Sequence, residues 1–264
     1  MKTSSVLLFV ILGFVVSSAS AQKAWEKPFS KWTQEESLKI LNSSPWSQAY
    51  TSPEGTAELD KQAIAREQAD LSIRPGRSYG NDGKSQARTM AISPVLVRLH
   101  SSSVIREAYV RLQQIGAGYD KFDNEKKSAF DASRKDMLDC PFCKNFYIVT
   151  MNKAIDTTGG SVEEGLFQTL TLEQLKGNVW LVNEAGEKRE LAQFIAPKKG
   201  DDMAVLFFPR KNGEAADFIS PQSKKFKILF NNEFFASNNQ YSKLLPRSFE
   251  FNVSKLILGD KVAF

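Results

Sequence analysis

The sequence predicts an α+β protein whose C-terminal part is an antiparallel β-sheet, sandwich-like or curved, with helices from the middle section packed on one face. Three observations predict this class. β-Prone runs separated by turn residues fill the last third of the chain. Apolar residues at helical spacing mark the middle section. About 240 residues remain after a leader, which is enough to bury a sizeable core.

The first 21 residues have the three parts of a signal peptide. Lys2 precedes an apolar run over residues 6–16, and a short polar stretch ends at Ala19 and Ala21, whose small side chains suit a signal peptidase. The apolar run is well short of the roughly 20 residues that cross a bilayer. We therefore predict export to the periplasm or the exterior, cleavage after Ala21 and no transmembrane anchor after cleavage.

Residues 22–51 are predicted to form an aromatic and helical segment ahead of the main domain. Thr33 can cap a short helix, and acidic side chains in its first turn favour the positive helix end. Pro45 stops the helix, because the residue before proline is pushed away from helical angles. Four aromatic side chains that precede the main fold are the candidate interface: Trp25, Phe29, Trp32 and Trp46.

Residues 52–88 are polar and contain several proline and glycine residues. Such a stretch buries too little apolar surface to offset the entropy of ordering, so it is predicted to be a mobile linker or insertion. The α+β globular domain is predicted to span residues 89–264 and to open with a strand over 92–99.

Two helices are predicted next. Apolar residues spaced by four, four and three indicate a helix over residues 103–115 that ends at Gly116. A second helix is expected over 124–138, followed by a strand over 146–151. The buried residues expected on the second helix are Phe130, Met137 and Leu138.

The remaining part of the chain is predicted to be sheet. A short helix over 171–176 precedes β-prone runs bounded by glycine, proline and asparagine residues. The predicted strands are 179–183, 189–195, 204–208, 226–230 and 249–258. The many phenylalanine residues of this part are interpreted mainly as core filling.

Cys140 and Cys143 form a Cys-x-x-Cys pair with no other cysteine in the chain. Haem attachment is excluded because Lys144 follows the second cysteine. Zinc lacks a second pair of ligands, since His100 is the sole histidine. The pair follows a helix and precedes a strand, the reverse of the thioredoxin-like order, so a helix N-terminus cannot lower the thiolate pKa. A structural disulfide is the preferred interpretation, and redox catalysis is the alternative.

No catalytic residue can be assigned from the sequence. His100 is interpreted as a strand-end residue, and Ser102 or Ser103 as the cap of the following helix, because no nucleophile elbow is present. Adjacent acids, at 35–36 and 163–164, are interpreted as solvated charges at helix starts. We predict no metal site and no cofactor.

The formal charge is +5 with an isoelectric point near 9.0, yet basic and acidic residues are interspersed. Without a basic stripe or a binding motif, the sequence predicts no nucleic-acid partner.

The motif Lys-Pro-Phe-x-x-Trp, residues 27–32, followed by Ser-Pro-Trp, residues 44–46, resembles uncharacterised exported bacterial proteins of acidobacterial type. The later phrases at 186–191, 194–195 and 207–211 of the β-rich section carry the same resemblance. It implies a bacterial, secreted or periplasmic setting and no known activity.

From these observations we expect a non-enzymatic binding or envelope-associated module whose partner is another envelope protein or a polymer. The alternative is a secreted or periplasmic hydrolase that uses carboxylates the sequence does not mark. A lesser alternative is a thiol oxidoreductase that works through Cys140 and Cys143.

Overall fold

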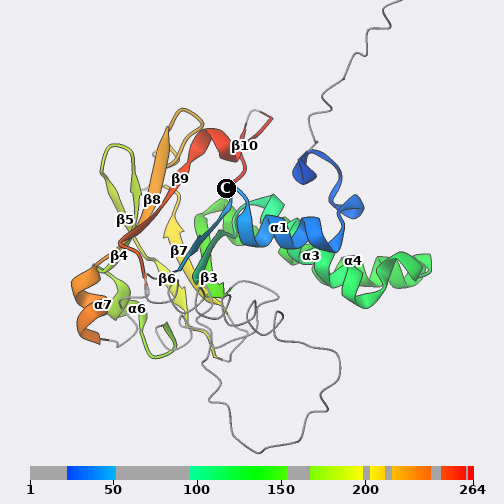
Figure 1. Ribbon diagram of the computed structural model, residues 1–264, viewed down its shortest axis with the longest axis horizontal. Helices are drawn as coiled ribbons and strands as arrows, with labels where there is room; N and C mark the ends of the chain where they lie inside the picture. Colours follow the sequence, from blue (N-terminus) through cyan, green and yellow to red (C-terminus); the bar gives the residue numbers. More distant parts are fainter. Residues whose placement is uncertain are drawn as a thin grey trace, which may run out of the picture.

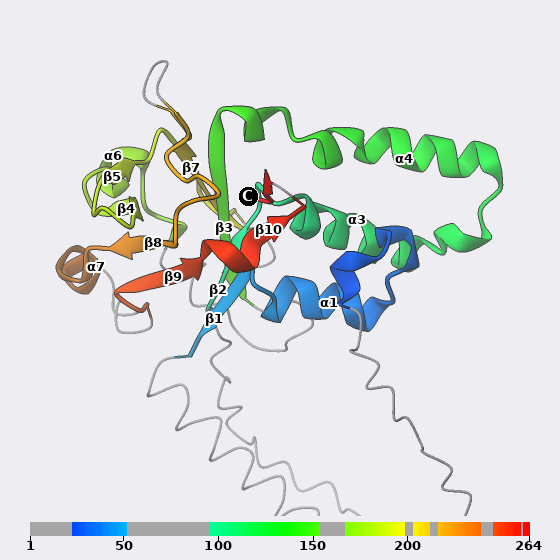
Figure 2. The same ribbon diagram turned by 90° about the horizontal axis from the view of Figure 1, so that it is seen from above.

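The computed structural model describes residues 23–51, 95–153, 167–198, 203–211, 216–238, 245–259 and 261–264 (Figure 1). Two antiparallel sheets stand next to each other, and the long helices lie on the side of the larger sheet that faces away from the smaller one (Figures 1 and 2). The predicted α+β class is confirmed, including antiparallel strands late in the chain.

The larger sheet has five strands in the order β1-β2-β3-β7-β6. Their bounds are β1 Ser47–Tyr50, β2 Val95–Leu99, β3 Phe146–Lys153, β7 Ala204–Pro209 and β6 Gln193–Ile195. The register places Leu99 opposite Val149 and Val149 opposite Leu206, so one buried row crosses three strands. All these pairs are antiparallel.

The smaller sheet has four strands in the order β5-β4-β8-β9. Their bounds are β5 Lys188–Glu190, β4 Val179–Asn183, β8 Lys225–Phe230 and β9 Ser248–Asn252. A separate two-stranded ribbon pairs β10 Ile257–Leu258 with β11 Lys261–Val262.

The helices come mostly from the middle of the chain. The α-helices are α1 Gln34–Ser43, α3 Ser103–Ala117, α4 Asn124–Asp139, α6 Leu172–Leu175 and α7 Asn232–Asn238. Short 3-10 turns are η1 Ala24–Glu26, η2 Phe29–Lys31, η3 Tyr119–Lys121, η4 Pro141–Lys144 and η6 Val253–Leu256.

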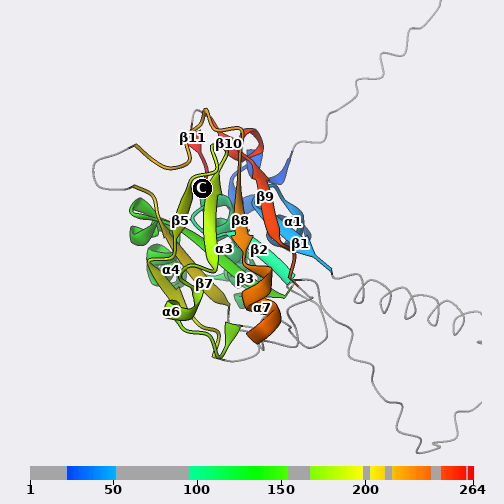
Figure 3. The same ribbon diagram turned by 90° about the vertical axis from the view of Figure 1, so that its left-hand side faces the viewer.

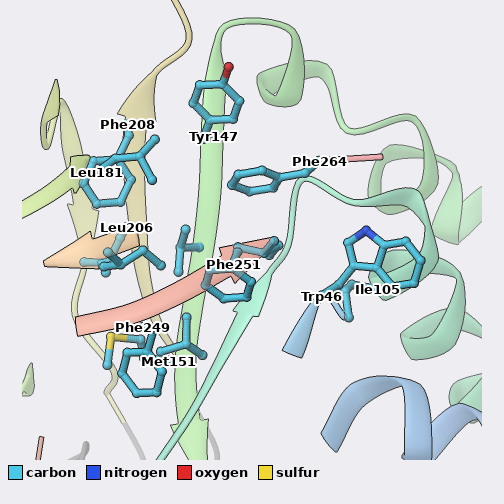
Figure 4. Close-up of a cluster of buried hydrophobic side chains, with 14 of the residues drawn as sticks. Trp46, Ile105, Tyr147, Met151, Leu181, Leu206, Phe208, Phe249, Phe251 and Phe264 are labelled. Carbon is cyan, nitrogen blue, oxygen red and sulfur yellow. The ribbon is translucent and has the colours of Figure 1, made fainter. Parts of the chain in front are cut away.

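The core between the two sheets is rich in aromatic residues (Figure 4). Phe226 stacks against both Phe251 and Phe264, with ring centres 5.2 and 5.0 Å apart. Tyr147, from the other sheet, lies 5.1 Å from Phe264. Phe226 and Phe251, two of the late phenylalanines that the sequence assigned to the core, therefore help to fill the space between the sheets.

Residues 23–51 of the predicted aromatic segment share a core with the domain that was predicted to begin at residue 89. Its strand β1 pairs with β2, and the backbone oxygen of Trp46 accepts a hydrogen bond from the Leu99 N–H at 2.9 Å. The predicted cap is present: Thr33 and Glu36 form a reciprocal capping box at the start of α1. A segment far from β2 in sequence thus supplies an edge strand that the local pattern did not reveal.

Helix α3 ends two residues later than predicted. Gly116 lies inside the helix, whereas Gly118 is the C-cap, with φ of +71°. Of these two glycines, only Gly118 adopts the left-handed backbone conformation, which costs glycine little.

Helix α4 confirms its predicted bounds to one residue, but its expected burial is wrong. Phe130, Met137 and Leu138 are half-buried, and no residue of α4 is fully buried. The helix lies alongside α3 and away from both sheets (Figure 2). Its polar surface therefore faces solvent over most of its length.

Two predicted strands are divided. The run 189–195 splits at Leu191, so that β5 joins the smaller sheet and β6 the larger one. The run 249–258 is interrupted by η6 between β9 and β10. A buried side chain lies at each break, Leu191 at the first and Val253 at the second.

The leader, the 52–88 stretch and the acids at 163–164 lie outside the described residues. Across the described ranges, no helix is both long and apolar enough to cross a membrane.

Candidate functional site

The candidate site lies on the outer face of the smaller sheet. Phe226, Ile228 and Phe230 point into the core from β8, so the alternate residues of this sheet point outward. Figure 3 looks onto this side and shows strands β5, β8 and β9 with no described helix crossing them. Helices α6 and α7 lie at one end of the strands.

Trp180 stands on this outer face, between β5 and β8. The register places Trp180 opposite Glu190 on one side and opposite Leu229 on the other. Its ring is only half-buried, although Val179 and Leu181 on either side are completely buried. The Nζ of Lys188 lies 4.2 Å from the ring centre, in a cation–π contact.

A groove of about 420 Å³ begins at Trp180 and runs to the start of α7. This volume is within the range of small-molecule and cofactor sites. Besides Trp180, its lining residues are Lys188, Leu229, Phe230, Asn231, Asn232, Glu233 and Arg247.

One wall of the groove is held rigidly. Asn231 donates from Nδ2 to Oδ1 of Asn178 at 2.8 Å, and its backbone N–H bonds the Asn178 oxygen at 2.9 Å. Its own Oδ1 accepts from the backbone N–H of Glu233 at 3.2 Å. These hydrogen bonds fix the start of α7, which supplies Asn232 and Glu233 to the groove.

The groove offers a flat aromatic ring with mixed polar groups around it. Lys188 and Arg247 are exposed donors, Glu233 is an exposed acceptor and Asn232 can do both. Such a set can hold a ligand that has an apolar face and a hydroxylated or amide-bearing rim.

Two of the four predicted interface aromatics are buried, and the other two are half-buried. Trp32 is 1% exposed and Trp46 is 0% exposed, so the expectation that they face a partner is corrected. Trp25 packs edge-on against Trp46 with ring centres 5.3 Å apart, and Phe29 packs against Trp32 at 6.3 Å. These side chains dock the N-terminal segment onto α3, where Arg111 Nε donates to the Trp32 oxygen at 2.9 Å.

Cys140 and Cys143 form the predicted disulfide, with Cα atoms 5.3 Å apart. Its place between the end of α4 and the start of β3 is also as predicted. The sequence did not reveal that two arginines converge on Cys143. Arg106 Nη1 lies 3.6 Å from the Cys143 sulfur, and Arg210 Nε donates to the Cys143 oxygen at 2.6 Å.

His100 lies at the end of β2, as predicted. Burial, and then the charges of Arg106 and Arg98, lower the pKa of His100 to about 4. Its Nδ1 is buried and has no hydrogen-bond partner within the described part of the chain. Ser102 is the N-cap residue of α3, but its hydroxyl makes no cap hydrogen bond. Among the described residues, no nucleophile forms a hydrogen bond with His100 Nδ1.

Other candidates are weaker. A larger hollow, about 600 Å³, runs along α4, but its lining comes from that one helix and includes no aromatic residue. Glu36 is occupied by a 2.6 Å ion pair with Lys27 and by its capping box with Thr33, which together lower its pKa. Within the described residues, no group of three or more His, Cys, Asp or Glu side chains could hold a metal ion.

The sequence prediction missed Trp180. A signal was present in the predicted strand 179–183. Side chains alternate between the two faces of a strand, so Trp180 must point to the face opposite that of Val179 and Leu181. The strand alone did not show that the outward face would remain uncovered.

Comparison of the chain with protein-family models, with curated protein sequences and with solved structures finds no match. The resemblance stated from the N-terminal motif remains a prediction.

Proposed function

We propose that this chain is an exported, non-enzymatic binding module that holds a glycan of the cell envelope against the outer face of its smaller sheet. The observation that carries the proposal is the half-exposed ring of Trp180 in a groove with a polar rim. Export is the expectation from the leader, and the disulfide is consistent with an oxidising compartment.

The chemistry of the groove favours a glycan over a protein partner. The core of a protein interface is depleted of charged residues. Here Lys188, Glu233 and Arg247 surround a single large aromatic ring. A sugar ring instead presents an apolar face, which can stack on an indole. Its hydroxyl groups can form hydrogen bonds with the charged side chains at the rim of the groove.

Lys188 does not block the site. Its side chain is exposed, and an exposed cation–π contact contributes only about 0.5–1 kcal/mol. A ligand that stacks on Trp180 can displace the ammonium group and then use it as a hydrogen-bond donor.

The test is co-sedimentation of the mature protein with insoluble glycans, namely purified peptidoglycan and, for comparison, cellulose. We expect the protein to sediment with peptidoglycan and Trp180→Ala to weaken binding by about tenfold or more, the equivalent of one buried aromatic contact. Phe142→Ala is the matched control, because it removes an aromatic side chain that is 60% exposed but lies outside the groove.

The proposal would be contradicted if the wild-type protein sedimented with neither glycan. It would also be contradicted if the Trp180→Ala variant sedimented as much as the wild type. The same incubations examine the hydrolase alternative. Release of soluble reducing sugar by the wild-type protein would favour that alternative over a binding module.

A further inference from the structure

The disulfide loop has the features of a reactive site, and these features are independent of the groove on the smaller sheet. Cys140 is 7% exposed, whereas Cys143 is only half-buried. Next to them Phe142 is 60% exposed, with its ring 6.5 Å from that of Phe207. One sulfur is therefore protected and the other lies beside an exposed apolar side chain.

Arg106 is buried, and its hydrogen-bond acceptors among the described residues include no carboxylate. The residue is 7% exposed, and its acceptors in the described chain are the backbone oxygens of Leu138, His100 and Ser101 and the sulfur of Cys143. Backbone oxygens carry only partial charge. Of these acceptors, only the Cys143 sulfur can become a full anion. It does so when the disulfide is reduced and the thiol loses its proton.

A second cation approaches from the opposite strand. Arg210, at the end of β7, donates to the Cys143 oxygen, and its guanidinium lies 4.2 Å from the centre of the Tyr147 ring. Burial, and also the charge of Arg210, lower the pKa of Arg106, whereas Glu107 and Asp139 raise it. Asp217 is 3.8 Å from Arg210, and Lys144 is exposed on the loop itself. An anion at Cys143 would relieve the repulsion between the two arginines.

We propose that Cys140–Cys143 exchanges its disulfide with a protein dithiol, and that Cys143 is the sulfur which the partner attacks. Thiolates beside arginine are stabilised, and the better-exposed sulfur is the one within reach of a partner. This site makes no use of the Trp180 groove, so its test and the glycan test are independent.

The exchange proceeds in two displacements. A thiolate of the partner attacks the Cys143 sulfur; the new bond forms, the Cys140–Cys143 bond breaks, and the Cys140 sulfur leaves and takes a proton. The second thiolate of the partner then attacks its own sulfur in the mixed disulfide. Cys143 leaves as a thiolate that Arg106 stabilises. The partner dithiol loses two electrons and two protons and becomes a disulfide, and the chain takes up both electrons.

The first experiment measures the rate at which iodoacetamide alkylates Cys143 in the reduced, folded protein as a function of pH, by mass spectrometry of the modified peptide. We expect a midpoint below the value of about 8.5 of a free thiol. Arg106→Gln should make alkylation below that midpoint about tenfold slower, which corresponds to about one pH unit. Arg106→Lys keeps the charge and should recover part of the rate.

Arg134→Gln is the matched control, because this arginine lies on α4 and stacks on Phe130 at 5.3 Å instead of on the disulfide. It should leave the profile unchanged. A wild-type midpoint at the ordinary thiol value would overturn the proposal, and this result requires no variant to fold.

The second experiment assigns the attacked sulfur. Cys140→Ser and Cys143→Ser, each shown by circular dichroism to be folded, are incubated with a disulfide-containing peptide. We expect the chain that retains Cys143 to form the mixed disulfide at least about tenfold faster than the chain that retains buried Cys140. Equal rates, or a faster reaction at Cys140, would overturn the assignment.

Discussion

Arg98 in β2 donates from Nε to the backbone oxygen of Leu41 at 2.5 Å, and this contact ties helix α1 to the larger sheet. The arginine is 0% exposed. Its Nη1 also bonds Asn152 Oδ1 on β3, and its Nη2 bonds Asn42 Oδ1 at 3.1 Å. One side chain therefore joins three elements that are distant in sequence.

Replacing Arg98 by methionine should lower the free energy of unfolding by about 3 kcal/mol or more, because several buried acceptors lose their donor at once. The measurement is urea denaturation of the mature protein. Lys39→Met, on the exposed face of α1, is the matched control and should change the stability by less than about 0.5 kcal/mol. Equal effects of the two substitutions would show that the network contributes nothing specific.

The two glycines near the end of α3 should respond to alanine with opposite signs. Gly118→Ala places a Cβ on a backbone with φ of +71° and should destabilise the protein by about 1 kcal/mol. Gly116→Ala lies inside the helix and should stabilise it by about 0.5–1 kcal/mol. Neither Cβ would meet an atom within 4 Å, so the difference between the two denaturation midpoints isolates backbone conformation.

His100 should make the protein less stable as the pH falls. Its pKa is about 4 in the folded chain and about 6.5 in the unfolded chain, so between these values the unfolded chain binds more protons. Stability that is complete above pH ~6.5 should decline as the pH falls to about 4, by at most about 3 kcal/mol. Denaturation across this range should show the slope in the wild type and a smaller slope in His100→Asn. An identical slope in both would assign the pH dependence to carboxylates instead.

Tyr119 should titrate unusually late. Its hydroxyl donates to Asp131 Oδ2 at 2.6 Å, and this hydrogen bond is the main reason that its pKa is raised to about 12. Asp131→Asn removes the carboxylate, so the pKa should fall toward the ordinary value of about 10. Ultraviolet titration of phenolate formation measures the change. Tyr119→Phe identifies which of the six tyrosines gives the late step, and an unchanged late step in Asp131→Asn would exclude the hydrogen bond as its cause.

Local patterns predicted the elements well where a single element determines them. The capping box at Thr33, the bounds of α4 and the strand 179–183 all follow from neighbouring residues. Prediction was poorer where two layers meet. Leu191 divides one predicted strand between two sheets, and no local period marks that change of sheet.

The candidate site shows the same limit. Spacing identified the Cys140–Cys143 disulfide, because the two sulfurs are three residues apart. It did not identify Arg106 or Arg210, since a helix and a distant strand bring these arginines to the loop. Likewise, aromatic character alone selected Trp32 and Trp46, which are buried, and overlooked Trp180, which is not.

By itself, the sequence determined the α+β class, most helices and strands, and the pairing of its two cysteines, because each depends on residues that are close along the chain. The tertiary structure alone decided which aromatic residues are covered, which sheet face remains open and which charges surround the disulfide. Exposure and electrostatic environment depend on residues that are distant in sequence, and only the packing of the sheets and helices brings those residues together.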